Sequence, residues 1–309
     1  MTKIRYDIVL ASYNGAKYIE EQINSIVKCI DDCKTATINK FIITDDNSSD
    51  DTLIIVKKLA QNIPYLYLYT NEVAKGVINN FQNGINKTSS EFVFFSDQDD
   101  IWDEKKITKT IEILLESEDE NKPLLVITNI NFVNENLSLL SSGHDFDRYS
   151  PSDELMTVYR SFGQGCTMAV NRKLLNFMGQ IPKEAVMHDW WMLLIASNFG
   201  KVRYITTPLL NYRQHSNNVC GGTKHNNIAR YFNLKNQRQY MKSLSMQSGK
   251  FVELYHDFFT EKKSLDAHVF LSQINNKNII EKISFVFSNK VKMKGLKNRI
   301  KLLLQMLAI

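Results

Sequence analysis

The stretch EFVFFSDQDDIW, residues 91–102, decides the fold class of this chain. Its apolar run at 92–95 lacks polar alternation, which is typical of a strand covered on both faces in a parallel α/β sheet. The carboxylates of Asp97, Asp99 and Asp100 follow at once. Ligands of open α/β sheets bind beyond the carboxyl ends of strands, so a D-x-D there can hold Mg²⁺ or Mn²⁺ against a diphosphate. The alternative interpretation is an acidic turn that opens a helix.

The segments before this stretch alternate between strand and helix patterns. Strands are expected at 6–11, 41–44 and 65–69, and helices at 19–30, 53–60 and 77–87. Four β-α units within about 100 residues predict a Rossmann-like, mostly parallel sheet flanked by helices. No G-x-G-x-x-G follows the first strand, and the loop offers the side chains of Ser12, Tyr13 and Asn14 instead, which disfavours an NAD enzyme.

The remaining segments are expected to complete this α/β domain and to extend it. We expect a helix at 107–114, a strand at 124–130, an irregular acceptor loop at 132–160, strands at 202–205 and 209–212, and helices at 228–245 and 251–259. The GQGCTMA run at 163–169 predicts either close backbone approach to a ligand or a bulge at a strand entrance.

Composition and charge divide the chain into two parts. With 309 residues, 43% hydrophobic content and only 5 Pro, it can bury a large core. Residues 201–309 carry 19 Lys and Arg against 5 Asp and Glu. We therefore predict an α/β domain at 1–222 and a basic helical extension at 223–309. The basic amphipathic pattern at 290–309 suits an anionic membrane surface, or else a docking helix for a partner protein, and we expect no nucleic-acid partner.

Cysteine usage and hydropathy bear on location. The 4 Cys show no metal-ligand spacing, and no run approaches the ~18 apolar residues of a membrane span. The first residues enter a strand pattern without signal-peptide architecture. We expect a cytoplasmic protein that associates peripherally with the inner face of the plasma membrane.

Two further clusters are candidates for chemistry. In HDWWMLL at 188–194, Asp189 precedes an apolar helix, where it is either an N-cap or a general base at the mouth of an apolar pocket. Arg213 and His215 follow the last expected strand, where they bind a phosphate and complete a metal shell, or lie in an exposed polar loop.

Several of these motifs together resemble one family. ASYNG at 11–15, TDDNSSDDT at 44–52, SDQDDIW at 96–102, GQGCTMAVNR at 163–172, HDWW at 188–191 and YRQHSNN at 212–218 are similar, in order and spacing, to motifs of family 2 glycosyltransferases of the GT-A fold. The likeness covers residues 6 to about 220 and is greatest to bacterial rhamnosyltransferase-type enzymes of surface polysaccharide synthesis.

The resemblance implies a set of site residues. It implies a nucleotide-sugar site formed by Ser12, Tyr13, Asn14, Asp45, Asp46, Lys75, Asn80, Asp97, Gln98 and Arg213. It implies metal ligation by Asp97, Asp99 and His215, catalysis by Asp189, and an acceptor site at Gly165, Cys166, His188 and Trp190. His188 departs from the pattern, because many relatives have an acidic residue there.

The implied activity is an inverting transfer from a nucleotide sugar, with rhamnose as one candidate, to a glycan or lipid-linked glycan. Asp189 would accept the proton of the acceptor hydroxyl, while Mg²⁺ or Mn²⁺ on Asp97 and Asp99 stabilises the leaving diphosphate. A metal-dependent nucleotidyltransferase and a non-catalytic glycan-binding or scaffold protein remain the alternatives. A binding module has no need of a base, so the presence of both D-x-D and Asp189 argues against the latter.

Overall fold

A computed structural model describes residues 4–71, 75–117, 122–143, 161, 163–216, 234–259, 271–288, 291 and 295–307. Its strands are β1 (Arg5–Ser12), β2 (Thr37–Asp45), β3 (Leu66–Thr70), β4 (Phe92–Ser96), β5 (Ile101–Trp102), β6 (Leu124–Val133), β7 (Leu139–Ser142), β8 (Met168–Asn171) and β9 (Lys201–Arg213). Its helices are α1 (Ile19–Asp32), α2 (Thr52–Ala60), α3 (Val77–Ile85), α4 (Lys106–Ser117), α6 (Arg172–Met178), α7 (His188–Phe199), α9 (Leu234–Tyr255), α11 (Ile279–Phe287) and α12 (Leu296–Leu307), with 3₁₀ turns η2 (Gly165–Thr167) and η3 (His256–Phe258).

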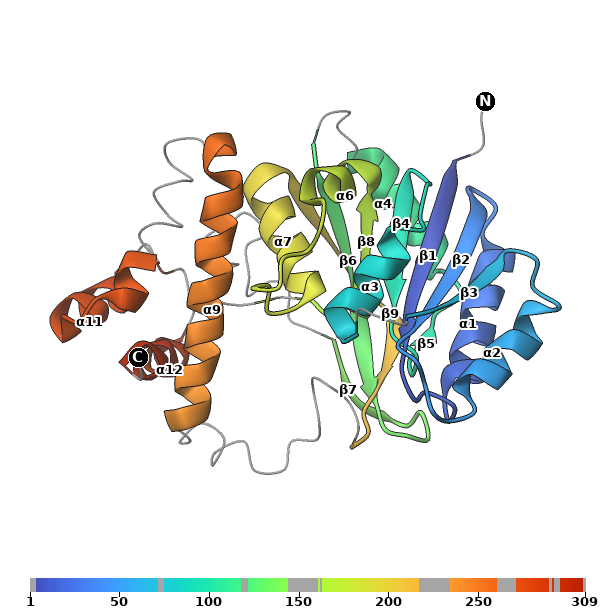
Figure 1. Ribbon diagram of the computed structural model, residues 1–309, viewed down its shortest axis with the longest axis horizontal. Helices are drawn as coiled ribbons and strands as arrows, with labels where there is room; N and C mark the ends of the chain where they lie inside the picture. Colours follow the sequence, from blue (N-terminus) through green and yellow to red (C-terminus); the bar gives the residue numbers. More distant parts are fainter. Residues whose placement is uncertain are drawn as a thin grey trace.

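The described strands form one sheet in the order β3-β2-β1-β4-β8-β6-β9-β5, with β7 paired to β6 (Figure 1). The parallel pairing expected for the first four strands is confirmed. Beyond β4 the sheet is mixed, because β8 runs antiparallel between β4 and β6. Since β8 starts beside the carboxyl end of β4, it brings η2 to the edge of the sheet where the acidic cluster begins.

The core explains why β4 is apolar throughout. Phe92 and Phe94 pack into a cluster with α1, α2 and α4 on one face of the sheet. Val93 and Phe95 pack into a second cluster with α3, α6 and α7 on the other. Side chains of a strand alternate between faces, so a strand covered by helices on both sides is apolar at every position. The prediction of a doubly covered strand is confirmed.

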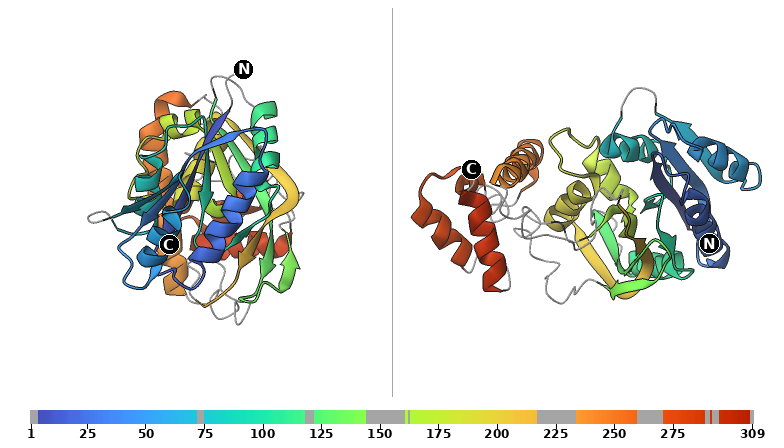
Figure 2. Two further views of the ribbon diagram at one scale, coloured as in Figure 1. Left: turned by 90° about the vertical axis from the view of Figure 1, so that its right-hand side faces the viewer. Right: turned by 90° about the horizontal axis from the view of Figure 1, so that it is seen from below.

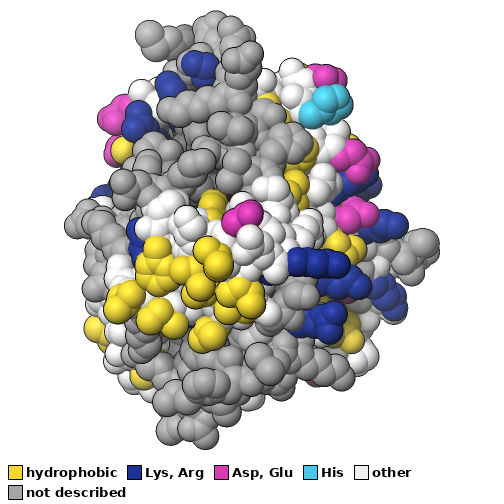
Figure 3. All heavy atoms as spheres, turned by 90° about the vertical axis from the view of Figure 1, so that its left-hand side faces the viewer, with side chains coloured by type: hydrophobic (Ala, Val, Ile, Leu, Met, Phe, Trp, Pro, Cys, Tyr) yellow, Lys and Arg dark blue, Asp and Glu magenta, His cyan; other side chains and the backbone are white. Residues whose placement is uncertain are grey.

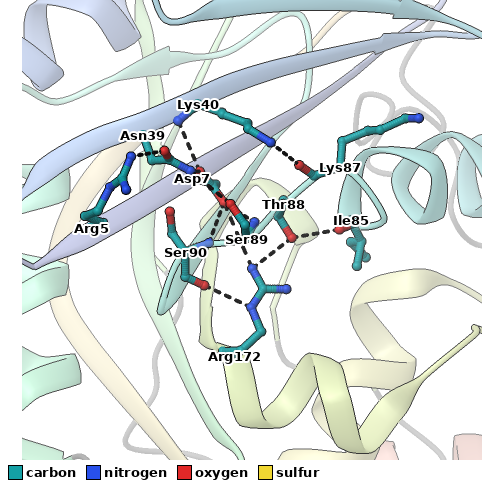
Figure 4. A network of polar contacts seen from close by, with 10 residues as sticks. All are labelled: Arg5, Asp7, Asn39, Lys40, Ile85, Lys87, Thr88, Ser89, Ser90 and Arg172. Carbon is teal, nitrogen blue, oxygen red and sulfur yellow. Dashed lines mark hydrogen bonds and ion pairs between the residues drawn. The ribbon is translucent and has the colours of Figure 1, made fainter.

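A polar network fixes the edge of the sheet opposite the acidic cluster (Figure 4). The carboxylate of Asp7 on β1 is fully buried. It accepts hydrogen bonds from Nδ2 of Asn39 at 2.8 Å and from the backbone N–H groups of Lys40 at 3.1 Å, Ser89 at 2.7 Å and Ser90 at 2.8 Å. Arg172 of α6 lies 4.0 Å from the same carboxylate. One charge thus joins β1, β2, the turn before β4 and α6.

Several element boundaries differ from the expected ones. The expected strands at 202–205 and 209–212 are one strand, β9, and the segment after 132 contains β7, while residues 144–160 lie outside the described part. The two helices expected between 228 and 259 are the single helix α9 followed by η3. Tertiary pairing overrides local breaks such as Thr206-Thr207-Pro208, because β9 gains a partner strand along most of its length.

The C-terminal helices lie beyond α7 at one side of the molecule, with α11 and α12 on the far side of α9 (Figure 2). Phe251 and Tyr255 of α9 pack against Trp191 of α7. The amphipathic helix expected near the chain end is present as α12, whereas Lys290, Lys292 and Lys294 lie outside the described residues. The domain division at 222 stays a prediction. Within the described part, no helix is both long and apolar enough to cross a membrane.

Candidate active site

The carboxyl ends of β4 and β9 bring the D-x-D segment and His215 together. Nε2 of His215 lies 2.9 Å from Oδ2 of Asp99, and both side chains are largely buried. The pairing arises because β9 ends two residues before His215 and runs parallel to β6, so its carboxyl end lies at the same edge as that of β4. Burial raises the pKa of Asp99, and the hydrogen bond from His215 works against this.

Arg213 holds this corner together through its backbone and its guanidinium group. Its N–H donates to Oδ1 of Asp100 at 3.1 Å, and its Nε donates to the carbonyl oxygen of Asp99 at 2.9 Å. Its other nitrogens donate to the carbonyl oxygen of Glu135 at 2.7 Å and to the carboxylate of Glu21. The side chain is 3% exposed. These contacts favour a positioning role over the direct phosphate contact that the sequence suggested.

Tyr18 completes the corner, and sequence reasoning missed it. Its ring stacks on His215 with centroids 4.9 Å apart, and the guanidinium of Arg213 lies 4.7 Å from the ring centroid. A cation over an aromatic face is stabilised by the ring quadrupole. The local sequence carried no signal for this contact, because its partners are nearly 200 residues away.

Asp97 of the D-x-D segment also belongs to a group with Asp100 and Cys166. Single ligand atoms of Asp97, Asp100 and Cys166 all lie within 4.8 Å of one another. Burial and the nearby charges of Asp99 and Asp189 raise the pKa of Asp97 to about 7. The pKa of Asp100 is raised by burial too, and then by the charges of Asp99 and Asp97.

The sequence did not identify Lys106 as part of this cluster. Its Nζ donates to the carbonyl oxygen of Cys166 at 2.6 Å, and burial lowers its pKa to about 8. The signal for it was present: Lys106, Thr110 and Leu114 follow one another at helical spacing along the buried side of α4. A lysine on such a side indicates a buried anionic partner.

These residues fit a hard divalent cation. Carboxylate oxygens are the ligands that Mg²⁺ and Mn²⁺ prefer, and His215 adds a nitrogen that Mn²⁺ accepts. Clustered carboxyl groups with raised pKa values are also what a bound dication would stabilise in their ionised form. Cys166 does not suit such an ion, since burial raises the pKa of its thiol well above the usual value and keeps it protonated.

Asp189 lies in the first turn of α7, beside η2. The N-cap is Met187, so the interpretation of Asp189 as the N-cap is wrong. Its Oδ2 accepts from the backbone N–H of Gly165 at 3.0 Å, and its Oδ1 accepts from the N–H of Trp190 at 2.6 Å. Burial raises its pKa to about 6, although these hydrogen bonds favour the ionised form. A carboxylate that titrates close to neutrality suits a general base.

Gly165 and His188 shape the space beside Asp189. A Cβ at Gly165 would lie 2.4 Å from Nε2 of His188, so only glycine fits there. His188 is 3% exposed and stacks on Phe81 with centroids 3.7 Å apart. Burial lowers its pKa to about 3, so the ring is neutral, and neither ring nitrogen has a hydrogen-bond partner among the described residues. Trp190 packs into the core.

The carboxyl ends of β1 and β2 form the other half of the site. Oγ of Ser12 donates to Oδ2 of Asp45 at 2.7 Å, and both side chains are buried. The amide of Gln98 pairs with the backbone of Tyr13, accepting from its N–H at 2.8 Å and donating to its carbonyl oxygen at 3.0 Å. A Cβ at Gly15 would lie 2.2 Å from Oε1 of Gln98, so glycine permits this pairing. The Tyr13 side chain stays 56% exposed.

Asp45 and Asp46 differ in burial and in their hydrogen bonds. Asp45 is fully buried and also accepts from Ser48, which makes it structural. Oδ2 of Asp46 accepts from the N–H of Gly76 at 2.7 Å, whereas its Oδ1 has no partner within the described part of the chain. Asn80 donates to the carbonyl oxygen of Ser12 at 2.9 Å and so supports the loop.

Asn14 and Lys75 are the last two residues expected in the nucleotide-sugar site. Asn14 has φ 48 and accepts from the N–H of Ser49 at 2.8 Å, so its amide is used in shaping the turn. Lys75 is exposed and precedes Gly76, whose N–H donates to Asp46.

Comparisons with known proteins agree with this geometry. The family model "Glycosyl transferase family 2" matches residues 7–177. The chain is 30% identical, over 69% of its length and 73% of the relative's, to the dTDP-rhamnosyl transferase RfbG of Shigella flexneri. It is 27% identical, over 63% of its length and 72% of the relative's, to the Escherichia coli UDP-Glc:alpha-D-GlcNAc-diphosphoundecaprenol beta-1,3-glucosyltransferase WfgD.

Solved structures share the fold. TarS of S. aureus, residues 1–349 in complex with UDP-GlcNAc, superposes with a TM-score of 0.56 at 15% identity, covering 92% of this chain and 79% of that one. The mannosyltransferase PcManGT from Pyrobaculum calidifontis, in complex with GDP-Man and Mn²⁺, gives a TM-score of 0.54 at 14% identity, covering 100% and 87%. The expected GT-A fold is confirmed, and with the match to more than half of its length the chain belongs to glycosyl transferase family 2.

Proposed function

We propose that this protein is an inverting, metal-dependent glycosyltransferase that moves a sugar from a nucleoside diphosphate to a glycan acceptor in cell-surface polysaccharide synthesis. One observation carries the proposal: the carboxylate of Asp189 accepts from the N–H of Gly165 at 3.0 Å, and the side chain of the next residue, Cys166, lies within 4.8 Å of Asp97 in the D-x-D segment. A cation site for the leaving diphosphate beside a separate carboxylate base is what a single displacement needs.

The donor we propose is a dTDP-linked deoxysugar such as rhamnose, because the relative of 30% identity is named a dTDP-rhamnosyl transferase. The exposed ring of Tyr13 offers a stacking surface for the base, and Oδ1 of Asp46 offers an acceptor for its imide N–H. Ser12, Asn14, Asp45, Asn80 and Gln98 then act by holding this loop in shape. Lys75 is exposed next to Gly76, which binds Asp46, and in this proposal it contacts the same donor.

Asp97, Asp99 and His215 are the residues that would hold Mg²⁺ or Mn²⁺. Such an ion supplies positive charge that stabilises the diphosphate as it leaves. Arg213 and Tyr18 position His215 and Asp99 for this role, because Arg213 holds the backbone carbonyl of Asp99 and Tyr18 stacks on the ring of His215.

The transfer itself requires a base at Asp189. The acceptor hydroxyl oxygen forms a bond to the anomeric carbon while the bond from that carbon to the diphosphate oxygen breaks, and the electron pair leaves with the diphosphate. The hydroxyl proton passes to the carboxylate of Asp189, which is mostly ionised at neutral pH because its pKa is about 6. Attack from the face opposite the leaving group inverts the anomeric configuration.

The acceptor side of the proposal is formed by Gly165, Cys166, His188 and Trp190. The neutral His188 can exchange hydrogen bonds with acceptor hydroxyl groups through its unpaired ring nitrogens. The acceptor we propose is a lipid-linked glycan, because the Escherichia coli relative is named for a diphosphoundecaprenol substrate. An enzyme for such an acceptor works at the cytoplasmic face of the plasma membrane, as a peripheral protein held by its basic C-terminal region.

A donor screen tests the proposal. Purified protein is incubated with dTDP-rhamnose, UDP-glucose, UDP-GlcNAc or GDP-mannose, with Mn²⁺ or EDTA, and thermal stabilisation and release of free nucleoside diphosphate are measured. We expect one donor to stabilise the protein only with the metal, and free nucleoside diphosphate to appear with a glycosylated acceptor. Release of inorganic diphosphate instead would indicate a nucleotidyltransferase, and binding without turnover would indicate a scaffold.

A further inference from the structure

The helices α11 and α12 bury Lys282, partly bury Arg299 and expose apolar side chains. Lys282 of α11 is 5% exposed and donates to the carbonyl oxygen of Met306 at 2.6 Å. Arg299 of α12 donates to the carbonyl oxygens of Val286 at 2.6 Å, Ser288 at 3.2 Å and Val291 at 2.7 Å, which lie at and just after the end of α11. These bonds satisfy backbone acceptors that a helix end leaves free. The two helices are therefore locked together by their cations.

The outer sides of the same helices are apolar. We call this surface the C-terminal apolar face; its residues are Ile279, Ile280, Ile283 and Phe287 of α11, and Leu296, Ile300, Leu304 and Leu307 of α12, each between 40% and 76% exposed. Figure 3 shows apolar side chains gathered in one patch on this side of the molecule, with Lys and Arg side chains beside it. An aqueous helix normally shows the opposite pattern, with its lysines outward and its isoleucines buried.

The positive charge around this face favours an anionic lipid surface as its partner. Residues 271–309 contain 8 Lys and Arg and a single acidic residue, Glu281. Lys277 and Lys301 are exposed and lie within two sequence positions of Ile279 and Ile300 of the face. A protein partner or a second copy of this basic segment would have to neutralise that charge, whereas an anionic lipid surface accepts both the charge and the apolar side chains.

We propose that the C-terminal apolar face is a docking surface that lies in the interface of an anionic membrane, with α11 and α12 inserted side by side. This rests on the proposed function, because a lipid-linked acceptor confines the reaction to a membrane surface. It goes beyond a basic tail, since α11 supplies three of the isoleucines of the face, Ile279, Ile280 and Ile283. The helices lie in the plane of the lipid head groups and do not span the bilayer.

Vesicle flotation tests this assignment with a matched pair of variants. Ile280→Glu with Ile283→Glu changes two residues of the face that are 76% and 41% exposed, and Ile54→Glu changes an isoleucine of α2 that is 67% exposed. Each anchoring isoleucine contributes about tenfold or more to partitioning, so the double variant should lose at least 100-fold on phosphatidylglycerol-containing vesicles. Ile54→Glu should float like the wild type. Leu304→Glu provides the same test from α12, and thermal melts confirm that each variant is folded.

The outcomes separate the possible occupants. Selective loss of flotation in the α11 and α12 variants supports the membrane assignment. Equal flotation of all variants, or no flotation of the wild type, overturns it. Sedimentation velocity provides a further check, since a wild-type dimer that the double variant dissociates without a change in flotation would assign the face to a second copy. Turnover of a soluble acceptor is measured on the same samples and should not change, so failure of the proposed activity is distinguishable from failure of membrane docking.

Discussion

Replacing Asp189 with Asn separates catalysis from stability at one position. The amide keeps the shape of the side chain, and its oxygen can still accept from the N–H of Gly165 or Trp190. It cannot take the proton of the acceptor hydroxyl. Loss of a positioned base costs about 10² to 10⁴ in rate. Donor affinity should stay near the wild-type value, because the hydrogen bonds to this carboxyl group come from the backbone of Gly165 and Trp190 and not from the nucleotide or cation residues.

The same substitution should raise the free energy of unfolding at high pH. The pKa of Asp189 is about 6 in the folded protein, against 3.8 for an ordinary Asp. A folded-state pKa above the unfolded value means that the folded state binds the proton more tightly, so stability falls as the pH rises from about 4 to above 6. At about 1.4 kcal/mol per pKa unit, this group costs the wild type up to about 3 kcal/mol at pH 8. Asn does not titrate and avoids that cost.

Two effects reduce the free energy of unfolding that the Asp189→Asn variant gains at high pH. The carboxyl group keeps some exposure, and the charge-assisted hydrogen bonds weaken when Asn replaces it. We therefore expect the variant to be about 1 to 2 kcal/mol more stable than the wild type at pH 8, with the advantage vanishing near pH 4. Urea unfolding at pH 4.5 and pH 8, with transfer rate and donor affinity measured on the same preparation, provides the assay.

Two outcomes would contradict the assignment of Asp189 as the base. Transfer within a few-fold of the wild-type rate would remove Asp189 from the mechanism. A variant that is less stable than the wild type at pH 8, with the same difference at pH 4.5, would show that the carboxylate is a structural hydrogen-bond acceptor and not a strained base. Wild-type transfer should also rise with pH through about 6, since the base must be ionised.

Three other changes test the surrounding structure. Asp99→Asn should abolish the Mn²⁺-dependent rise in Tm, because an amide is a poorer ligand for a hard cation, and an unchanged rise would exclude Asp99 from the metal site. Tyr18→Leu should weaken donor binding in the presence of Mn²⁺ about 3- to 10-fold, because it removes the aromatic ring that contacts Arg213 and His215. Tyr18→Phe keeps the ring and should bind the donor like the wild type. Equal donor affinities of the two variants, measured by titration, would argue against a role for the stacked ring. Asp7→Asn should lower the free energy of unfolding, measured in urea, by about 2 to 4 kcal/mol, because it removes a buried charge from the N–H groups that donate to it. Turnover per folded molecule should stay the same. A change in kcat would contradict the placement of Asp7 away from the active site.

The parallel half of the fold and the position of the acidic cluster could be predicted from the sequence. Both follow from local patterns, since an uninterrupted apolar run such as 92–95 needs cover on both faces, and the residues after a strand lie at the edge of a sheet. The helices α1, α2 and α3 were predictable because their apolar stripes are amphipathic at helical spacing.

Which distant side chains share the site depends on the tertiary structure. The antiparallel insertion of β8 carries Gly165 and Cys166 to the end of β4, and the full length of β9 carries His215 to Asp99. Tyr18 could not be predicted, because its contacts with the end of β9 depend on how α1 and β9 are placed against each other. Local periodicity encodes which face of an element is buried, but the pairing of elements is set by the global minimum of packing and hydrogen bonding, which no short stretch of sequence contains.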